Sequence, residues 1–205
     1  MRELVKIDAV AMLEHRALRW KDDTCFYLLE FFSGRRYGFD PDNDLVKHLK
    51  RRIDRCDAFG LQQKEWACSD IADMLRPAFA SLFDFTTTTF VPVPPSQTRP
   101  SPNYDDRVVR LLRGACAASA DIRELIVCRE EVEPVHFSPE RPSAGKLVEN
   151  FVLGDIGGEP VRERIVVFDD IITSGNHFVA CKRFLLGHFP GREVVGVFVA
   201  RRVLG

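Results

Sequence analysis

The sequence predicts an α/β fold, with a central parallel sheet flanked by helices and an N-terminal extension. Two observations predict it. From residue 88 onward, short strand-like apolar runs alternate with helical patterns, which favours parallel strands joined by right-handed crossovers. Residues 165–178 (IVVFDDIITSGNHF) place a buried strand, two adjacent acids, a Thr-Ser-Gly turn and a helical pattern in succession. Because ligands bind at the carboxyl ends of strands in open α/β sheets, we expect a site at this turn.

The composition is that of a soluble globular protein. The chain has 205 residues, of which 45% are hydrophobic and 29% charged, and a net charge of −1. Such a balance creates no global field that would draw the protein to nucleic acid or to a membrane. No apolar run approaches the roughly 20 residues that span a bilayer, and the N-terminus does not have the apolar core of a signal peptide. We therefore expect a cytoplasmic protein.

The cysteines and histidines do not indicate a metal site. None of the six cysteines belongs to a C-x-x-C pair, and the five histidines are scattered along the chain. Most of the cysteines lie among apolar residues, so we expect buried, reduced thiols.

The first 87 residues are expected to form an α+β extension or hood. A strand is predicted over 25–32, a helix over about 44–57 and a second helix over about 64–76, which Pro77 should end or kink. Residues 40–43 offer caps for the first helix. That helix carries a basic face, which could meet phosphates but is most simply a solvated surface. The second helix has a core stripe of Ala67, Ile71, Met74 and Leu75.

Residues 88–205 are expected to form the ligand-binding core. Strands are predicted over 89–95, 122–128, 165–168 and 193–200, with helices over about 104–119 and from the Thr-Ser-Gly turn to about His188. The long segment 129–160 has little periodicity, and long structureless loops in compact domains are commonly functional lids.

The turn after the acid pair has the chemistry of a phosphate cradle. Ile171, Ile172, Thr173, Ser174, Gly175 and Asn176 supply backbone N–H groups, and three of them add polar side chains. Gly175 permits a positive φ or a close approach of the ligand. The following helix N-terminus adds a favourable dipole, so a phosphate group is the expected ligand.

Residues 168–175 resemble the phosphoribosyl-pyrophosphate (PRPP) motif of type I phosphoribosyltransferases. The resemblance covers about residues 88–205 and is closest to ComF-like and amidophosphoribosyltransferase-like members. It implies that Asp169 and Asp170 hold the ribose 2′- and 3′-hydroxyls and that the turn holds the 5′-phosphate. It also implies Mg²⁺ bound with PRPP and bridging its pyrophosphate oxygens, with Asp169 and Asp170 as further candidate ligands.

The segment VPVPPSQTR, residues 91–99, lies where this family has its pyrophosphate loop. The resemblance implies that Ser96, Gln97 and Thr98 donate to pyrophosphate and that Arg99 neutralises it. Relatives often place Lys or Arg directly after the Ser, where this chain has Gln97, which weakens charge compensation. Farther on, Arg107 is expected to reach either this loop or an acid.

A basic segment of the predicted lid is a further candidate. Arg141 and Lys146, with Arg129 behind them, could stabilise the departing pyrophosphate, and the spacing Arg-x4-Lys-x3-Asn is similar to the lid of ComF-like relatives. A closed lid would also exclude water, since hydrolysis competes with transfer. The alternative is an ordinary solvated loop.

The resemblance implies a transferase that displaces pyrophosphate at ribose C1 with a nitrogen nucleophile, whose identity the sequence does not indicate. The alternative is a non-catalytic PRPP-binding regulator or a ComF-like accessory factor in nucleic-acid metabolism. Direct nucleic-acid binding through the basic helix is disfavoured by the near-zero net charge, and a homodimer is left open. A haloacid-dehalogenase-type phosphatase is excluded because the second acid is one residue out of place.

Overall fold

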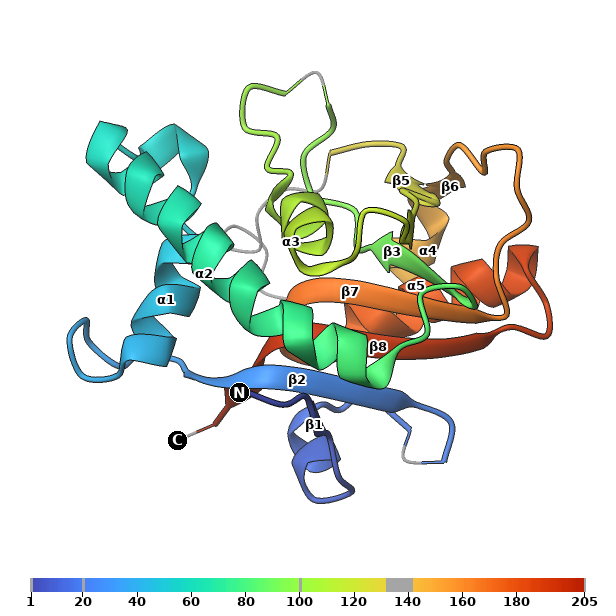
Figure 1. Cartoon of the computed structure of the whole chain (residues 1–205), viewed down its shortest axis with the longest axis horizontal. Helices are drawn as coiled ribbons and strands as arrows, with labels where there is room; N and C mark the ends of the chain where they lie inside the picture. The colour runs from blue at the N-terminus through green and yellow to red at the C-terminus, as the bar shows by residue number, and fades with distance from the viewer. Residues whose placement is uncertain (1, 20, 100, 132–141, 205) are drawn as a thin grey trace.

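The central element is a six-stranded, mostly parallel sheet, and it confirms the predicted α/β class (Figure 1). The computed structural model describes residues 2–19, 21–99, 101–131 and 142–204. In spatial order the strands are β1 (Val5–Lys6), β2 (Thr24–Phe32), β8 (Glu193–Val203), β7 (Arg164–Ile172), β3 (Thr88–Pro92) and β4 (Asp121–Ile122). Only the pairing of β1 with β2 is antiparallel within this sheet.

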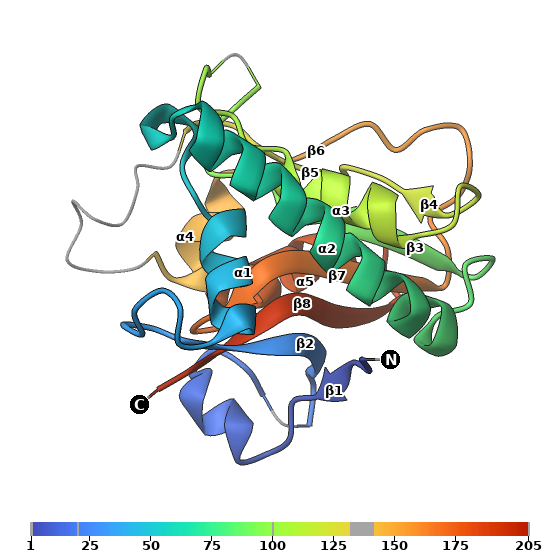
Figure 2. The ribbon, with the colours of Figure 1, turned by 60° about the vertical axis from the view of Figure 1, so that its left-hand side comes forward.

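Helices cover both faces of the sheet (Figures 1 and 2). One face carries α1 (Pro41–Leu49), α2 (Ala58–Leu82) and α3 (Arg107–Ala115). The other carries the 3-10 helix η1 (Ala11–Glu14), α4 (Ala144–Glu149), α5 (Asn176–His188) and a small hairpin of β5 (Ile126–Cys128) and β6 (Phe151–Leu153). A second 3-10 helix, η2 (Ile53–Arg55), connects α1 to α2.

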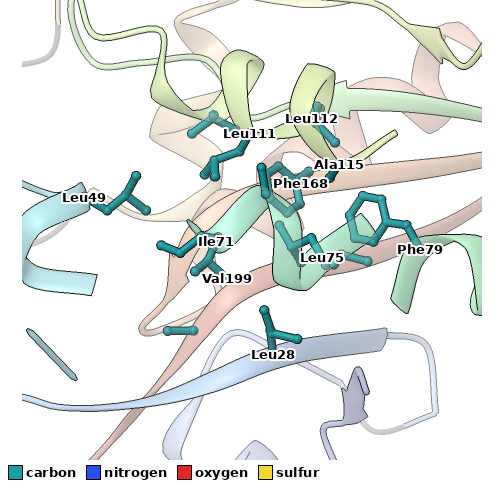
Figure 3. Close-up of a cluster of buried hydrophobic side chains, with 14 of the residues drawn as sticks. Leu28, Leu49, Ile71, Leu75, Phe79, Leu111, Leu112, Ala115, Phe168 and Val199 are labelled. Carbon is teal, nitrogen blue, oxygen red and sulfur yellow. The ribbon is translucent and has the colours of Figure 1, made fainter. Parts of the chain in front are cut away.

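Strand β7 is buried on both sides, which explains its continuous apolar sequence. Val166 and Phe168 face the α2 side, whereas Ile165 and Val167 face the α5 side. Figure 3 shows the first of these cores, in which Phe168 meets the edge of Phe79 at a ring-centroid distance of 5.8 Å. The carboxyl end of β7, which carries the acid pair, is therefore held by packing from the helices on both faces of the sheet.

Helix α2 is longer than predicted at both ends, since it begins at Ala58 and continues past Pro77 to Leu82. A proline inside a helix removes one backbone hydrogen bond and costs about 3 kcal/mol. Buried residues continue on both sides of it, from Ile71 and Leu75 to Phe79, and their burial offsets that cost. Helix α1 is shorter than predicted, and begins where Asp40 caps the N–H groups of residues 42 and 43.

Two other predicted segments are wrong in detail. The predicted strand 122–128 is split, since β4 pairs with β3 while β5 pairs with β6. The described part of the predicted structureless segment contains α4 and β6, which are fixed by buried side chains. Leu147 and Phe151 lie in the second core, where the Phe151 ring meets the edge of Phe184.

The sheet also crosses the predicted boundary between residues 87 and 88. Strand β2 pairs in parallel with β8 along most of its length, from Thr24 opposite Val195 to Phe32 opposite Val203. The first 87 residues thus supply β1 and β2 to the sheet and α1 and α2 to one face. Their function as a substrate hood stays a prediction.

The cysteines and the helices also bear on expectations from the sequence. All six cysteines have free thiols, and four of them are buried, as expected; Cys56 and Cys128 are partly exposed. Within the described ranges, every helix is too short or too polar to cross a membrane.

The close packing of α2 on α3 gives a matched pair of glycine substitutions. Gly114 and Gly187 are each the penultimate residue of a helix, α3 and α5 respectively. A Cβ on Gly114 would lie 2.8 Å from the Ala72 Cβ, whereas a Cβ on Gly187 would meet nothing within 4 Å. We expect Gly114→Ala to lower the free energy of urea unfolding by about 1–3 kcal/mol.

Gly187→Ala is the control and should raise the unfolding free energy by about 0.5–1 kcal/mol, because only helix propensity changes there. Equal stabilisation by both substitutions would contradict the described approach of α3 to α2.

Candidate functional site

The candidate site lies where the strand order changes direction. From β3 the chain crosses through α3 to β4, whereas from β7 it crosses through α5 to β8, on the opposite side. Loops that follow β3 and β7 consequently diverge to opposite faces and leave a crevice between them. Such a switch point is where open α/β sheets bind ligands.

A cavity of about 460 Å³ occupies this position. The loop after β3, the start of α3, the end of β7 and the segment after α1 all contribute to its wall. Charged, polar and strand-end residues make up much of this wall, among them Lys50, Arg52, Asp54, Ser96, Gln97, Asp105, Asp106, Arg107, Asp169, Asp170, Ile171, Thr173 and His177. The acid pair, part of the predicted phosphate turn and part of the predicted pyrophosphate loop therefore meet in one cavity.

The acid pair lies inside β7, not after it, because the strand continues to Ile172. Asp170 is 5% exposed and points to the α3 side, where the Arg107 guanidinium donates to it from Nε at 2.9 Å and from Nη2 at 2.5 Å. The Lys50 ammonium lies 3.8 Å from the other carboxylate oxygen. Burial alone would raise the pKa of Asp170, but Lys50 and Arg107 outweigh it and hold that pKa below its ordinary value.

A buried lysine extends this ion pair into a network. Lys64 of α2 is 1% exposed and lies 2.8 Å from the Asp105 carboxylate, which also pairs with Arg107 at 2.6 Å. The same ammonium donates to the carbonyls of Leu49 at 2.5 Å and Arg51 at 3.0 Å. Buried charges are retained only with such partners. The network thus fixes the backbone around residues 49–51 beside the acid pair.

Asp169 is in a different electrostatic environment from its neighbour. Its carboxylate accepts the backbone N–H of Asp170 at 2.8 Å, but no ion pair to it is found within the described residues. Burial and the adjacent negative charge of Asp170 raise the pKa of Asp169. The pair therefore combines one carboxylate that is firmly ionised with one that is readily protonated.

The turn that follows β7 is held from behind by the N-terminal segment. The His15 ring is fully buried and its Nδ1 donates to the Thr173 carbonyl, while the Ala17 N–H donates to the Ser174 carbonyl at 2.9 Å. Gly175 has φ of 85°, and a Cβ there would lie 2.9 Å from a Leu18 methyl group. Only glycine fits this position, which sets the entry into α5.

The predicted phosphate-binding residues have different surroundings in this turn. Ile171 and Thr173 line the cavity, whereas Ile172 is buried in the second core. The Ser174 hydroxyl accepts the backbone N–H of Asn176 at 3.4 Å, and the Asn176 side chain donates to the Pro142 carbonyl at 3.0 Å. Phosphate contacts would therefore come mainly from backbone N–H groups at the α5 N-terminus.

The predicted pyrophosphate loop is only partly at the cavity. Ser96 and Gln97 line it, whereas Thr98 and Arg99 are not among its lining residues, and their contacts with pyrophosphate stay a prediction. The Arg99 guanidinium is drawn away by the Glu124 carboxylate at 2.5 Å and lies over the Tyr104 ring. The Thr98 hydroxyl is 3.4 Å from the Glu131 carboxylate.

The predicted lid cations are not at the described cavity either. Lys146 is exposed in the first turn of α4 and does not line the cavity, and Arg129 does not line it. Helix α4 packs through Ala144 and Leu147 on the second core, which directs Lys146 to solvent. Arg141 lies outside the described residues.

Sequence reasoning identified one part of the charge network and missed another. Arg107 reaches an acid, which is one of the two predicted alternatives. Lys64 and Asp105 were missed, although Lys64 continues the apolar stripe of α2 three residues before Ala67, which is a detectable signal. Lys50 lies on the basic face of the predicted helix over 44–57, for which contact with phosphates was one alternative. The position of Arg52 at the cavity has no such signal, because the connection after α1 sets it.

The cavity residues are compatible with Mg²⁺ only if a ligand supplies most of its oxygens. Within the described ranges, no group of three or more His, Cys, Asp and Glu side chains could hold a metal ion. Asp170 is engaged by Arg107, which leaves Asp169 as the carboxylate of the pair that could join the ion. One carboxylate combined with substrate phosphates and water is a common way to bind Mg²⁺.

The raised pKa of Asp169 predicts a pH-dependent stability difference. Its ordinary pKa is 3.8, and its pKa in the folded protein is higher, so above pH 4 the folded state binds more protons than the unfolded state. The free energy of unfolding contributed by this group therefore falls as pH rises. Asp169→Asn removes this pH dependence. Between about pH 4 and about pH 8, its free energy of urea unfolding should therefore rise by more than about 1 kcal/mol relative to that of the wild-type protein.

Asp170→Asn should behave in the opposite sense. The folded-state pKa of Asp170 is lowered, so its stabilising contribution is present above 3.8 and is lost as pH falls below that value. The difference in unfolding free energy between the wild-type protein and Asp170→Asn should therefore decrease as the pH is lowered below 3.8. Identical pH profiles for the two variants would contradict the asymmetry of the pair.

Comparison with known proteins does not add a family assignment. No protein-family model matches the chain, and a search of curated proteins returns no match. The functional interpretation therefore depends on the residues and geometry of this cavity.

Proposed function

We propose that this protein is a PRPP-dependent phosphoribosyltransferase of the type I class, which displaces pyrophosphate at ribose C1 with a nitrogen nucleophile. The observation that carries the proposal is the cavity at the switch point, where the acid pair, the turn before α5 and residues 96 and 97 come together. Because residues 96 and 97 are far in sequence from the acid pair and the turn that follows it, their presence in the same cavity is support for the proposal from outside residues 168–175.

The arrangement gives each part of PRPP a chemically suitable neighbour. The 5′-phosphate would lie at the N-terminus of α5, where the backbone N–H groups of the first turn and the helix dipole favour a dianion. The ribose hydroxyls would donate to Asp169, whose carboxylate is not held in a described ion pair. The diphosphate would then extend toward the loop of Ser96 and Gln97.

The reaction would need no covalent nucleophile on the protein. The bond between C1 and the diphosphate oxygen breaks with its electron pair, a C1–N bond forms, and the nucleophile loses a proton. The ionised Asp170 would favour the positive charge that develops on the ribose, and Asp169 would add to this effect when a bound cation favours its ionised form. Mg²⁺, bound with the diphosphate and Asp169, would supply further neutralisation of the leaving group. Position and charge complementarity provide the rest of the acceleration.

A PRPP-binding regulator is the second candidate, and a specific observation favours it. Arg99, predicted to neutralise pyrophosphate, and the described lid cations Arg129 and Lys146 do not line the cavity. A cavity that binds PRPP without assisting departure of pyrophosphate would act as a sensor.

The first test is binding. Asp169→Asn removes the carboxylate proposed to accept the ribose hydroxyls, and should weaken PRPP binding at least about tenfold, or about 1.4 kcal/mol. Titration calorimetry with Mg²⁺ measures this change. Asp73→Asn, on the exposed surface of α2, is the matched control and should bind PRPP as the wild-type protein does. Unchanged affinity in Asp169→Asn would refute the assignment of this carboxylate.

The second test distinguishes the enzyme from the sensor. Release of pyrophosphate from PRPP is measured across a panel of nucleobases and ammonia. Release with one acceptor supports the transferase, whereas tight binding without release across the panel supports the regulator. Failure of the wild-type protein to bind PRPP at all would exclude both.

A further inference from the structure

The cavity has an unusual charge balance for a diphosphate site. Among the described residues, its wall includes three cationic side chains, Lys50, Arg52 and Arg107, and five acidic ones. Arg107 is already shared between Asp105 and Asp170. A polyanionic ligand would therefore be repelled unless the remaining two cations face it.

Lys50 and Arg52 come from the segment after α1, outside the part of the chain that resembles the transferase family. Their side chains are about two-fifths exposed, at 40% for Lys50 and 39% for Arg52, so both are accessible to a ligand. The Lys50 ammonium lies 3.8 Å from Asp170, which places it beside the acid pair. A cation at this distance can reach a ligand held by that pair.

The backbone that carries these two cations is fixed by a buried charge. The Lys64 ammonium, 1% exposed, donates to the carbonyls of Leu49 and Arg51, the residues on either side of Lys50. Through Asp105 and Arg107 the same ammonium is connected to Asp170. The position of residues 49–51 relative to the acid pair is thus set before any ligand binds, which lowers the entropic cost of binding.

Arg52 can exchange its present partner for a ligand. It donates to Asp54 from Nε at 2.8 Å and from Nη2 at 2.5 Å, in an ion pair that is open to solvent. Because both side chains are accessible to solvent, a phosphate can replace the Asp54 carboxylate as the partner of the guanidinium. The planar guanidinium suits bidentate binding of phosphate oxygens.

We propose that Lys50 and Arg52 are the diphosphate-binding cations of this site, in place of the basic residue that relatives carry next to Ser96. The inference rests on the proposed function and names which residues neutralise the diphosphate. It accounts for two observations together, namely that Gln97 brings no charge to the cavity and that Arg99 is paired with Glu124 outside it. The N-terminal segment is then a part of the substrate site.

Ribose 5-phosphate tests the inference because it lacks the diphosphate at C1. Titration calorimetry with Mg²⁺ compares PRPP and ribose 5-phosphate on Lys50→Met, Arg52→Met and the double variant. Each single substitution should weaken PRPP binding about tenfold and the double about a hundredfold, while ribose 5-phosphate affinity changes less than about twofold. Thermal unfolding checks that the variants, altered at accessible side chains, remain folded.

Two arginines serve as controls. Arg55 belongs to the same segment and lines a neighbouring hollow that Arg52 also lines, but Arg55 is not among the residues that line the cavity. Arg99→Met removes the cation that the loop position alone would have favoured. Arg55→Met and Arg99→Met should both bind PRPP as the wild-type protein does. The inference is overturned if Arg99→Met weakens PRPP binding while Arg52→Met does not. It is also overturned if the Lys50 and Arg52 variants lose affinity for PRPP and for ribose 5-phosphate to the same extent. A wild-type protein that binds neither ligand would instead refute the proposed function, on which the inference depends.

Discussion

The ion pair between Arg107 and Asp170 is the constraint on which the rest of the site depends. Asp170 is enclosed between the sheet and the helices on one face, and a buried carboxylate without a cation would be strongly destabilising. Arg107 supplies that cation from the first residue of α3 and thereby fixes the start of this helix against β7. Lys64 and Asp105 satisfy the remaining charges and connect α2 and the end of α1 to the same point. One network thus positions residues from four helices and strands around the cavity.

The network also separates the two neighbouring acids in function. Asp170 has its charge compensated within the protein, so it is ionised and contributes to structure and to the local potential. Asp169 has no compensating cation among its described contacts, and burial and Asp170 raise its pKa. It is therefore the acid whose charge would respond most to a ligand, because a hydroxyl donor or a cation would favour its ionised form.

Much of the fold could be predicted, since β7, α5 and β8 have strong apolar patterns that packing on both sides requires. Predictions failed where tertiary contacts override a local signal. Pro77 is accommodated because the buried stripe of α2 continues past it, and segment 144–153 is ordered by Leu147 and Phe151 despite its weak periodicity. The acid pair and turn were identified from the motif, but the ion pair of Arg99 with Glu124 was not predicted, because the two residues are remote in sequence. The basic face of the predicted helix over 44–57 indicated Lys50, but Arg52 reaches the cavity through a connection whose course no local pattern specifies.

The most direct test of the central claim is a crystal structure of the protein with PRPP and Mg²⁺. The account predicts the 5′-phosphate at the N-terminus of α5, the ribose hydroxyls at Asp169, and the diphosphate between residues 96–97 and the side chains of Lys50 and Arg52. PRPP bound away from the acid pair, or in the reverse direction with its diphosphate at the turn of residues 173–176, would contradict it.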